Sequence, residues 1–210
     1  LMDHSAKRPT KLPGRRCFAR RQLPPLILMT DDVRLADPLP AVTRLPRGCA
    51  VLLRHYADPN RAKLARALVP LCRRHGIKLL IAGDARLAAA VGADGFHLPE
   101  AMLRRGCRRW QAWRKPHWIV TAAAHSRASL RAAARLGADA ALLSPVFHTA
   151  SHPDAAALGV LKFARWAGES PVPVYALGGI GAHNGRRLAG SGIVGIAGIS
   201  GLMAEKPAGP

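Results

Sequence analysis

Hydroxyl and imidazole side chains, which bind phosphate and transfer protons, cluster directly after one short apolar run near the middle of the chain. That run, residues 140–143, holds only small and branched side chains and is typical of a fully buried strand. Pro145 should end it, because proline has no N–H to donate to a neighbouring strand. The loop that follows contains His148, Thr149, Ser151 and His152. Since ligands bind at the carboxyl ends of parallel strands, we expect this loop to form part of a binding site.

Two loops near the end of the chain have the chemistry of a phosphate cradle. Gly178 and Gly179 follow the last but one apolar run, and Ile199 and Ser200 follow the last one. Glycine lets the backbone approach a ligand closely, and free N–H groups at a helix N-terminus hold an anion. A Gly-Gly pair alone is also consistent with a tight turn. Two such loops after the last two strands match the phosphate site common in α/β barrels, so we predict phosphate binding there.

Histidines form a second group of candidates for acid–base or metal chemistry. Five of them lie at or near the ends of predicted strands: His55, His97, His125, His148 and His152. A metal site needs three or four converging ligands, and these histidines have no regular spacing that supplies them. The alternative makes His97 a hydrogen-bonded core or rim residue and gives His125 and His152 to phosphate binding. Neutral imidazole carries no charge above about pH 6.5, so binding by His152 should depend on pH.

Eight short apolar runs alternate with segments of helical pattern, and this alternation predicts the fold. The predicted strands are 26–30, 50–54, 78–82, 95–98, 118–122, 140–143, 172–177 and 194–198. The predicted helices cover 39–45, 60–75, 85–91, 126–136 and 155–167. The sequence Gly-Ala-Asp recurs at 92–94 and 137–139, as expected for βα repeats. Eight such repeats close into a parallel eight-stranded (β/α)8 TIM barrel, with a doubly wound open sheet as the structural alternative.

Composition fits one domain with a basic extension. The 210 residues are 49% hydrophobic, enough for one substantial core, and we predict a single barrel domain over residues 23–205. The formal net charge is +20, and the first 25 positions hold seven basic residues against one acid, Asp3. Residues 1–22 are therefore predicted to form a disordered basic arm. Such an arm attracts polyanions without specificity.

A second basic group lies between two predicted strands and raises the question of nucleic-acid binding. It consists of Arg104, Arg105, Arg108, Arg109, Arg114 and Lys115, with Trp110, Trp113 and Trp118 nearby. The tryptophans could stack on bases. The alternative is a solvated, arginine-rich outer helix whose tryptophans pack inward. We favour the alternative and predict no specific nucleic-acid partner.

Cysteine usage and hydropathy predict a cytoplasmic protein. The four cysteines, Cys17, Cys49, Cys72 and Cys107, lie far apart without a C-x-x-C spacing, so we interpret them as reduced thiols. No run approaches the roughly 18 apolar residues of a membrane span. The basic N-terminus also lacks the apolar segment of a signal peptide. No membrane partner is predicted.

Several motifs occur in the order and at the spacing of a known family. They are Thr30-Asp31, Arg54, Val91 to Leu98, Ala124-His125-Ser126, Ser144-Pro145-Val146-Phe147-x-Thr149, Ala176 to Ile180 and Ile199-Ser200. Each motif is modest alone, but the ordered set is specific. Over about residues 24–203 the chain resembles the thiamine phosphate synthase family, which includes the TenI-type thiazole tautomerases. The fold of that family is a (β/α)8 barrel, in agreement with the independent strand count.

The resemblance implies a reaction and a set of substrate contacts. The synthases couple hydroxymethylpyrimidine pyrophosphate to thiazole phosphate with Mg²⁺ and release pyrophosphate, so small phosphorylated molecules are the implied partners. Arg54 matches the arginine at the pyrophosphate. Thr149 and Ser151 match the two hydroxyls that contact the thiazole phosphate, while Gly179, Ile199 and Ser200 match the phosphate-cradling backbone. Arg54, His125 and His152 are then the catalytic candidates, Gly178 joins the phosphate loop, and a homodimer is left open.

The chain departs from the family pattern at the metal and lysine positions. The Asn-Asp-Arg after the third strand is Ala82-Gly83-Asp84 here, and the second magnesium carboxylate falls on Met102. Asp84 and Glu100 lie nearby and could rebuild a site for Mg²⁺ from oxygen ligands. Lysines of the family are replaced by Tyr56 and His152, and the histidine of the tautomerase branch is Pro145.

Three functions follow from these patterns. The first, to which the ordered motifs and the phosphate loops point, is a divergent thiamine phosphate synthase. The second is a TenI-like protein that binds or isomerises a thiazole phosphate without transferase activity. The third is of another class, a basic nucleic-acid-binding or regulatory protein built on a barrel.

Overall fold

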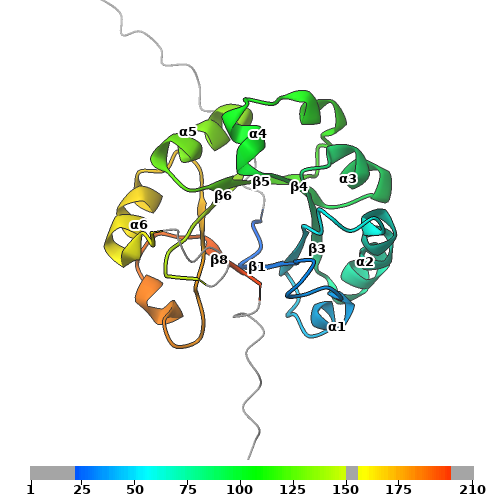
Figure 1. Ribbon diagram of the computed structural model, residues 1–210, viewed down its shortest axis with the longest axis horizontal. Helices are drawn as coiled ribbons and strands as arrows, with labels where there is room; N and C mark the ends of the chain where they lie inside the picture. The colour runs from blue at the N-terminus through cyan, green and yellow to red at the C-terminus, as the bar shows by residue number, and fades with distance from the viewer. Residues whose placement is uncertain (1–21, 150–155, 200–210) are drawn as a thin grey trace, which may run out of the picture.

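The computed structural model describes residues 22–149 and 156–199 (Figure 1). The predicted basic arm, apart from residue 22, lies outside the described residues, as do the site candidates Ser151, His152 and Ser200. All eight predicted strands and the Gly178-Gly179 loop fall within them, and of the second predicted phosphate loop Ile199 does.

Eight parallel strands close into a barrel, which confirms the predicted fold. The strands are β1 (Leu26–Met29), β2 (Ala50–Leu53), β3 (Lys78–Ala82), β4 (Gly95–Leu98), β5 (Ile119–Ala124), β6 (Ala140–Leu143), β7 (Val174–Leu177) and β8 (Gly195–Gly198). Each strand pairs with the next, and β8 returns to β1 with Ile196 opposite Leu26. This last pairing removes the open-sheet alternative, because an open sheet leaves its two edge strands unpaired.

Side chains from the strands fill two separate apolar layers. One layer is inside the barrel and includes Ile27, Leu52, Leu80 and Tyr175. The other lies between the strands and the helices and includes Leu28, Val51 and Phe96. Successive strand residues point to opposite faces, so strands buried on both faces are apolar without interruption, which explains the short runs in the sequence. The Tyr175 hydroxyl donates to the Pro24 carbonyl oxygen at 2.7 Å, just before β1, and this bond lies at the amino-terminal end of the barrel.

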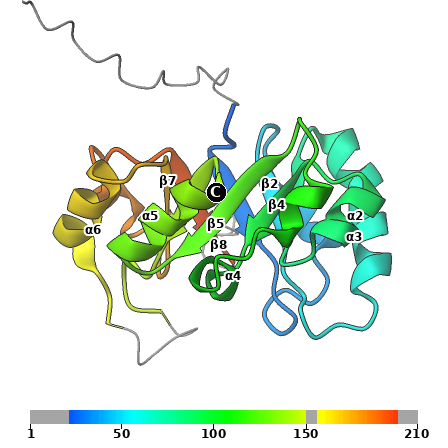
Figure 2. The same cartoon turned by 90° about the horizontal axis from the view of Figure 1, so that it is seen from above.

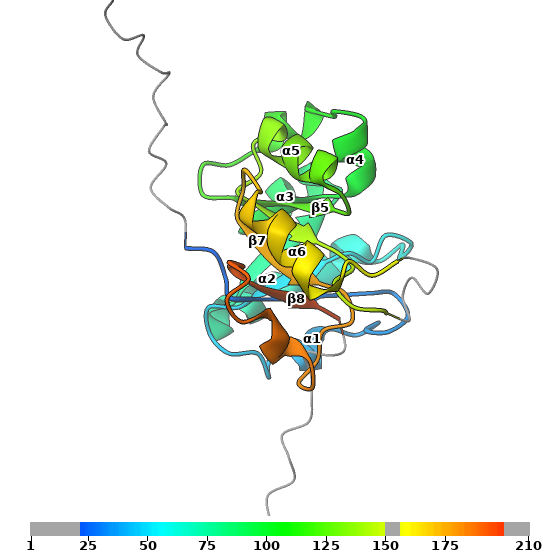
Figure 3. The ribbon, with the colours of Figure 1, turned by 90° about the vertical axis from the view of Figure 1, so that its left-hand side faces the viewer.

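Helices surround the strands (Figures 1 and 2). They are α1 (Leu39–Val42), α2 (Arg61–His75), α3 (Ala85–Val91), α4 (Glu100–Arg104), α5 (Arg127–Leu136) and α6 (Gly159–Gly168), with two 3-10 helices, η1 (Arg109–Trp113) and η2 (Gly185–Leu188). Glycines end α2, α3 and α5 in the left-handed conformation, Gly76 as predicted. The short helix α4 packs beside α5 (Figures 1 and 3).

Helix α6 begins later than the predicted start at residue 155. The N–H groups of Leu158 and Gly159 donate to the carbonyl oxygens of Pro145 and Val146, at 2.9 and 3.0 Å. These bonds tie the segment before α6 to the loop after β6. Backbone committed to that loop cannot enter a helix earlier, so the tertiary contact overrides the local helical pattern.

The tryptophans of the second basic group mostly pack inward. Trp110 and Trp118 are buried and stack on Phe96, with ring centroids 5.5 and 6.2 Å apart, while Trp113 is half exposed. The Arg114 guanidinium lies 5.6 Å from the Trp110 ring centroid and donates to the Gly137 carbonyl oxygen. Two of the three rings are therefore unavailable for base stacking, as the favoured alternative predicted.

Cys49, Cys72 and Cys107 are free thiols, and the first two are buried. Burial raises the pKa of the Cys72 thiol to about 12, with a smaller contribution from Asp94. Such a thiol stays protonated and is a poor nucleophile. Among the described residues, no helix is long and apolar enough to cross a membrane.

Candidate active site

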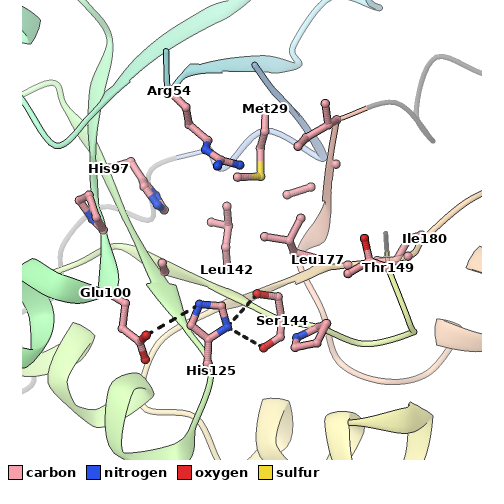
Figure 4. A pocket seen from close by; sticks show the side chains of 18 of the residues that line it. Met29, Arg54, His97, Glu100, His125, Leu142, Ser144, Thr149, Leu177 and Ile180 are labelled. Atoms are coloured by element: carbon pink, nitrogen blue, oxygen red, sulfur yellow. Dashed lines mark hydrogen bonds and ion pairs between the residues drawn. The ribbon is translucent and has the colours of Figure 1, made fainter. Parts of the chain in front are cut away.

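A cavity of about 730 Å³ opens at the carboxyl ends of the strands. Its floor is apolar and is formed by Met29, Leu142 and Leu177, from β1, β6 and β7 (Figure 4). Polar side chains surround that floor. Seven site residues predicted from the sequence line the cavity, namely Arg54, Glu100, His125, Thr149, Gly178, Gly179 and Ile199.

Arg54 and His55 follow each other at the end of β2, but a hydrogen-bond network gives them different positions. His55 is buried, with the unusual φ of 22°. Its Nε2 donates to the Ala36 carbonyl oxygen at 3.0 Å, and its Nδ1 accepts from the Thr30 hydroxyl at 2.8 Å. The same Thr30 oxygen accepts from the Arg54 N–H at 3.1 Å. His55 is therefore a structural residue, and the prediction that it faces the open end of the barrel is wrong. Arg54, in contrast, points into the cavity (Figure 4).

His97, from β4, lies in the cavity wall as an uncharged side chain. It is buried, and its Nδ1 lies 2.9 Å from the Thr121 hydroxyl oxygen. Burial, together with the positive charge of Arg54, lowers the pKa of His97 to about 3. His97 is thus neutral near pH 7, in line with the predicted hydrogen-bonded core or rim role.

The depressed pKa of His97 has a measurable effect on stability. The unfolded chain takes up this proton near pH 6.5, whereas the folded chain does so only near pH 3. Stability should therefore be lost as pH falls through this window, with a slope of up to about 1.4 kcal/mol per pH unit. We expect His97→Gln to remove this part of the slope in urea unfolding measured from pH 7 to 4. His117→Gln, at an exposed position, is the control, and an unchanged slope in His97→Gln would contradict the assignment.

Glu100 and His125 face each other across the cavity wall (Figure 4). His125 Nδ1 lies 2.9 Å from the Ser144 carbonyl oxygen, which only accepts, so Nδ1 carries the hydrogen. In the neutral ring, Nε2 is then a proton acceptor, and it lies 4.0 Å from Glu100 Oε2. Glu100 is the first residue of α4, a short helix that the sequence pattern did not reveal. The pair therefore presents a base and a carboxylate at the wall of one cavity.

The described donors do not fit a divalent cation held jointly by Asp84 and Glu100. Asp84 caps α3, its carboxylate accepting from the Leu87 N–H at 2.8 Å, and it is absent from the described lining of the cavity. No group of three histidine, cysteine or acidic side chains that could hold a metal occurs in the described part of the chain. The shared magnesium site stays a prediction that this geometry does not support.

Gly83, at the family's metal-carboxylate position, has little room for a side chain. Its φ is 73°, and a Cβ there would lie 3.3 Å from the Tyr56 ring and 3.4 Å from Pro99. Tyr56, which replaces a lysine of the family, therefore packs over the place where the carboxylate would extend. An aspartate at position 83 would have a strained backbone and would be crowded by Tyr56 and Pro99. The glycine at 83 and the tyrosine at 56, which both depart from the family pattern, therefore fit each other.

The glycine loop after β7 is held against the loop after β6. Gly178 and Gly179 have φ values of 101° and 64°. A Cβ on Gly179 would lie 2.3 Å from the His148 carbonyl oxygen, and one on Gly178 would lie 2.7 Å from Pro145 Cα. Asn184, a residue that the sequence patterns missed, fixes the loop by donating to the Gly179 carbonyl oxygen at 2.8 Å. Close approach of two loops thus requires these glycines before any ligand is considered.

Alanine at Gly179 should destabilise the protein more than alanine at Gly192. Both positions have positive φ, 64° and 73°, but a Cβ on Gly192 meets nothing within 4 Å. Gly192→Ala should cost about 1–2 kcal/mol, the strain of a left-handed alanine. Gly179→Ala should cost about 1–3 kcal/mol more, because the two loops must separate. Equal losses in urea unfolding would show that the loops do not pack as described.

Comparison with known proteins identifies the family. The family model described as thiamine monophosphate synthase matches residues 28–202. The thiamine-phosphate synthase of Methylobacillus flagellatus is 35% identical over 196 residues, 88% of this chain and 91% of the relative. That of Chlorobium luteolum is 35% identical over 190 residues, 88% of each chain. The solved thiamine phosphate pyrophosphorylase of Pyrococcus furiosus superposes with a TM-score of 0.70 at 26% identity, covering 89% of this chain and 90% of that one. The chain therefore belongs to the thiamine monophosphate synthase family.

Proposed function

We propose that the chain is a thiamine phosphate synthase that couples hydroxymethylpyrimidine pyrophosphate to thiazole phosphate. The observation that carries the proposal is one cavity with two polar sides across an apolar floor. Arg54 lies on one side, and Thr149 with the Gly178-Gly179 loop lies on the other (Figure 4). An apolar floor accepts aromatic rings, while the two polar sides suit two separate phosphate groups.

The reaction exchanges one bond for another without redox change. The bond between the pyrimidine methylene carbon and the pyrophosphate oxygen breaks, and that carbon bonds to the thiazole nitrogen. Negative charge develops on the departing pyrophosphate, where the Arg54 guanidinium stabilises it. The other side of the cavity holds the thiazole phosphate so that the ring nitrogen lies in line with the carbon.

Positive charge develops on the pyrimidine methylene as pyrophosphate leaves. Glu100 is the one carboxylate lining the described cavity, and its side chain is about one quarter exposed, 28%. A carboxylate at the wall of a largely apolar cavity stabilises a nearby cation more than it does in water. We assign Glu100 this electrostatic role. No step of this mechanism depends on a metal held by the protein.

A test of the function is product formation by the full chain. Incubation with both substrates, with and without Mg²⁺, should give thiamine phosphate and pyrophosphate in equal amounts, measured by chromatography. The result that counts against the proposal is absence of product when calorimetry shows that both substrates bind.

One observation favours a second function, isomerisation of a thiazole phosphate. His125 is hydrogen-bonded to Ser144, directly before Pro145, the position of the histidine in the tautomerase branch. When the imidazole is neutral, its Nε2 is the proton acceptor and could take up a proton from the thiazole ring and return it. Exchange of a ring hydrogen of the thiazole for deuterium in D₂O, lost in His125→Asn, would support this function.

A further inference from the structure

Two arginines and one aspartate form a charged cluster at the cavity rim between β1 and β2. Asp31 Oδ2 lies 3.1 Å from Arg34 Nη2 and 3.9 Å from Arg54 Nη2. Asp31 Oδ1 accepts the N–H groups of Val33 and Arg34, each at 3.1 Å. Both arginines line the cavity. The carboxylate therefore holds two guanidinium groups beside one oxygen atom.

The cluster carries a net positive charge at every pH at which Asp31 is ionised. The side-chain hydrogen bond from Arg34, followed by the two backbone N–H bonds, holds the pKa of Asp31 well below its usual range despite partial burial. Asp31 is thus ionised, and the two guanidiniums leave one net positive charge. The neutral imidazole of His97, also in the cavity wall, adds none.

The part of the rim next to this cluster provides fewer charged groups that could bind an anion. Arg61, from α2, donates its guanidinium N–H groups to the carbonyl oxygens of Leu53 and Ala82, at the ends of β2 and β3. Gly83 stands at the first metal-carboxylate position of the family, and Met102 at the second. Among the described residues, the cations that line the cavity are Arg34 and Arg54.

We propose that Arg34 and Arg54 form a diphosphate subsite, positioned by Asp31, that binds the two adjacent phosphoryl groups without a protein-held metal ion. This inference rests on the proposed function and adds Arg34 to its binding machinery. Guanidinium groups bind phosphate oxygens through paired N–H donors. Two guanidinium groups whose Nη2 atoms both lie within 4 Å of one carboxylate oxygen are close enough to bind one ligand with two linked phosphoryl groups. A diphosphate offers these two groups more negative charge and more acceptor oxygens than orthophosphate does.

Isothermal titration calorimetry of the full chain with inorganic pyrophosphate and with orthophosphate, both in EDTA, tests the subsite. Pyrophosphate should bind at least about tenfold more tightly than orthophosphate. Arg34→Ala should weaken pyrophosphate binding by about tenfold or more, the loss expected for one charge-assisted contact. Arg34→Lys should lose less, since it keeps the charge without the fork. Arg165→Ala, with a 72% exposed side chain on α6, should bind as the parent does.

Two results would overturn the subsite. One is unchanged pyrophosphate binding in Arg34→Ala, and the other is pyrophosphate binding that requires Mg²⁺. Circular dichroism and Arg34→Gln guard against a variant that fails to fold.

The subsite and the proposed function fail in different ways. If the parent makes no thiamine phosphate but Arg34→Ala still loses pyrophosphate affinity, the subsite stands and the function falls. If product forms and Arg34→Ala leaves both the affinity and the KM for the pyrimidine substrate unchanged, the subsite alone falls. The KM for thiazole phosphate serves as the internal reference and should not change.

Discussion

Arg54→Ala is expected to lower kcat/KM for thiamine phosphate formation by about 10²- to 10³-fold, the usual cost of removing one preorganised donor to developing negative charge. The Arg54 backbone N–H is anchored on Thr30, and the guanidinium enters the cavity next to Asp31. The loss should fall mainly on kcat, because charge on pyrophosphate increases as the bond breaks. Steady-state kinetics with both substrates varied measures it.

Two further variants test whether the loss is specific to the guanidinium of Arg54. Arg54→Lys keeps the charge but not the two-pronged donor, so it should recover only part of the activity. Arg66→Ala, on the exposed side of α2, should leave kcat/KM unchanged. A loss below about threefold in Arg54→Ala would mean that pyrophosphate leaves elsewhere in the cavity.

Glu100→Gln should lower kcat by about 10- to 100-fold with little change in either KM. The substitution keeps the shape of the side chain but removes the negative charge that faces the developing pyrimidine cation. It also removes the charge 4.0 Å from His125 Nε2. Pre-steady-state or steady-state rates of product formation at saturating substrate report this change directly.

Dependence on Mg²⁺ separates this electrostatic role from a metal-binding one. If Glu100 held a metal ion, raising the Mg²⁺ concentration should restore the rate of Glu100→Gln. If it acts through its charge, added Mg²⁺ should not restore the rate. Glu169→Gln, which removes a surface carboxylate paired with Arg127 and Arg165, is the control and should behave as the parent. Full activity of Glu100→Gln would remove Glu100 from the mechanism.

Short elements show where local sequence stops being informative. The helix α4 and the 3-10 helices η1 and η2 have four or five residues each, too few for a period of 3.6 to emerge. Helix α4 nevertheless places Glu100 in the cavity wall. The signal that could have located it is Pro99, directly before an acidic residue in the first turn.

The sequence by itself determined the barrel and the order of its loops. Strands buried on both faces need uninterrupted apolar runs, and helices need glycine or capping residues at their ends, so both leave local signals. Residues 95–98 and 140–143 are strands within the predicted bounds. The loops that follow the strands, with Arg54, Thr149 and the two glycines, were located for the same reason.

Only the tertiary structure decided which side chains meet. His55 and His125 both follow apolar runs, yet His55 is buried under the β1 loop while His125 lines the cavity. The difference depends on a backbone dihedral and on contacts across strands far apart in sequence. Arg34 pairs locally with Asp31, three residues earlier in the chain, but only the pairing of β1 with β2 brings Arg54 beside them. Which side chains face each other across the barrel depends on how the sheet closes, and no local sequence pattern encodes this.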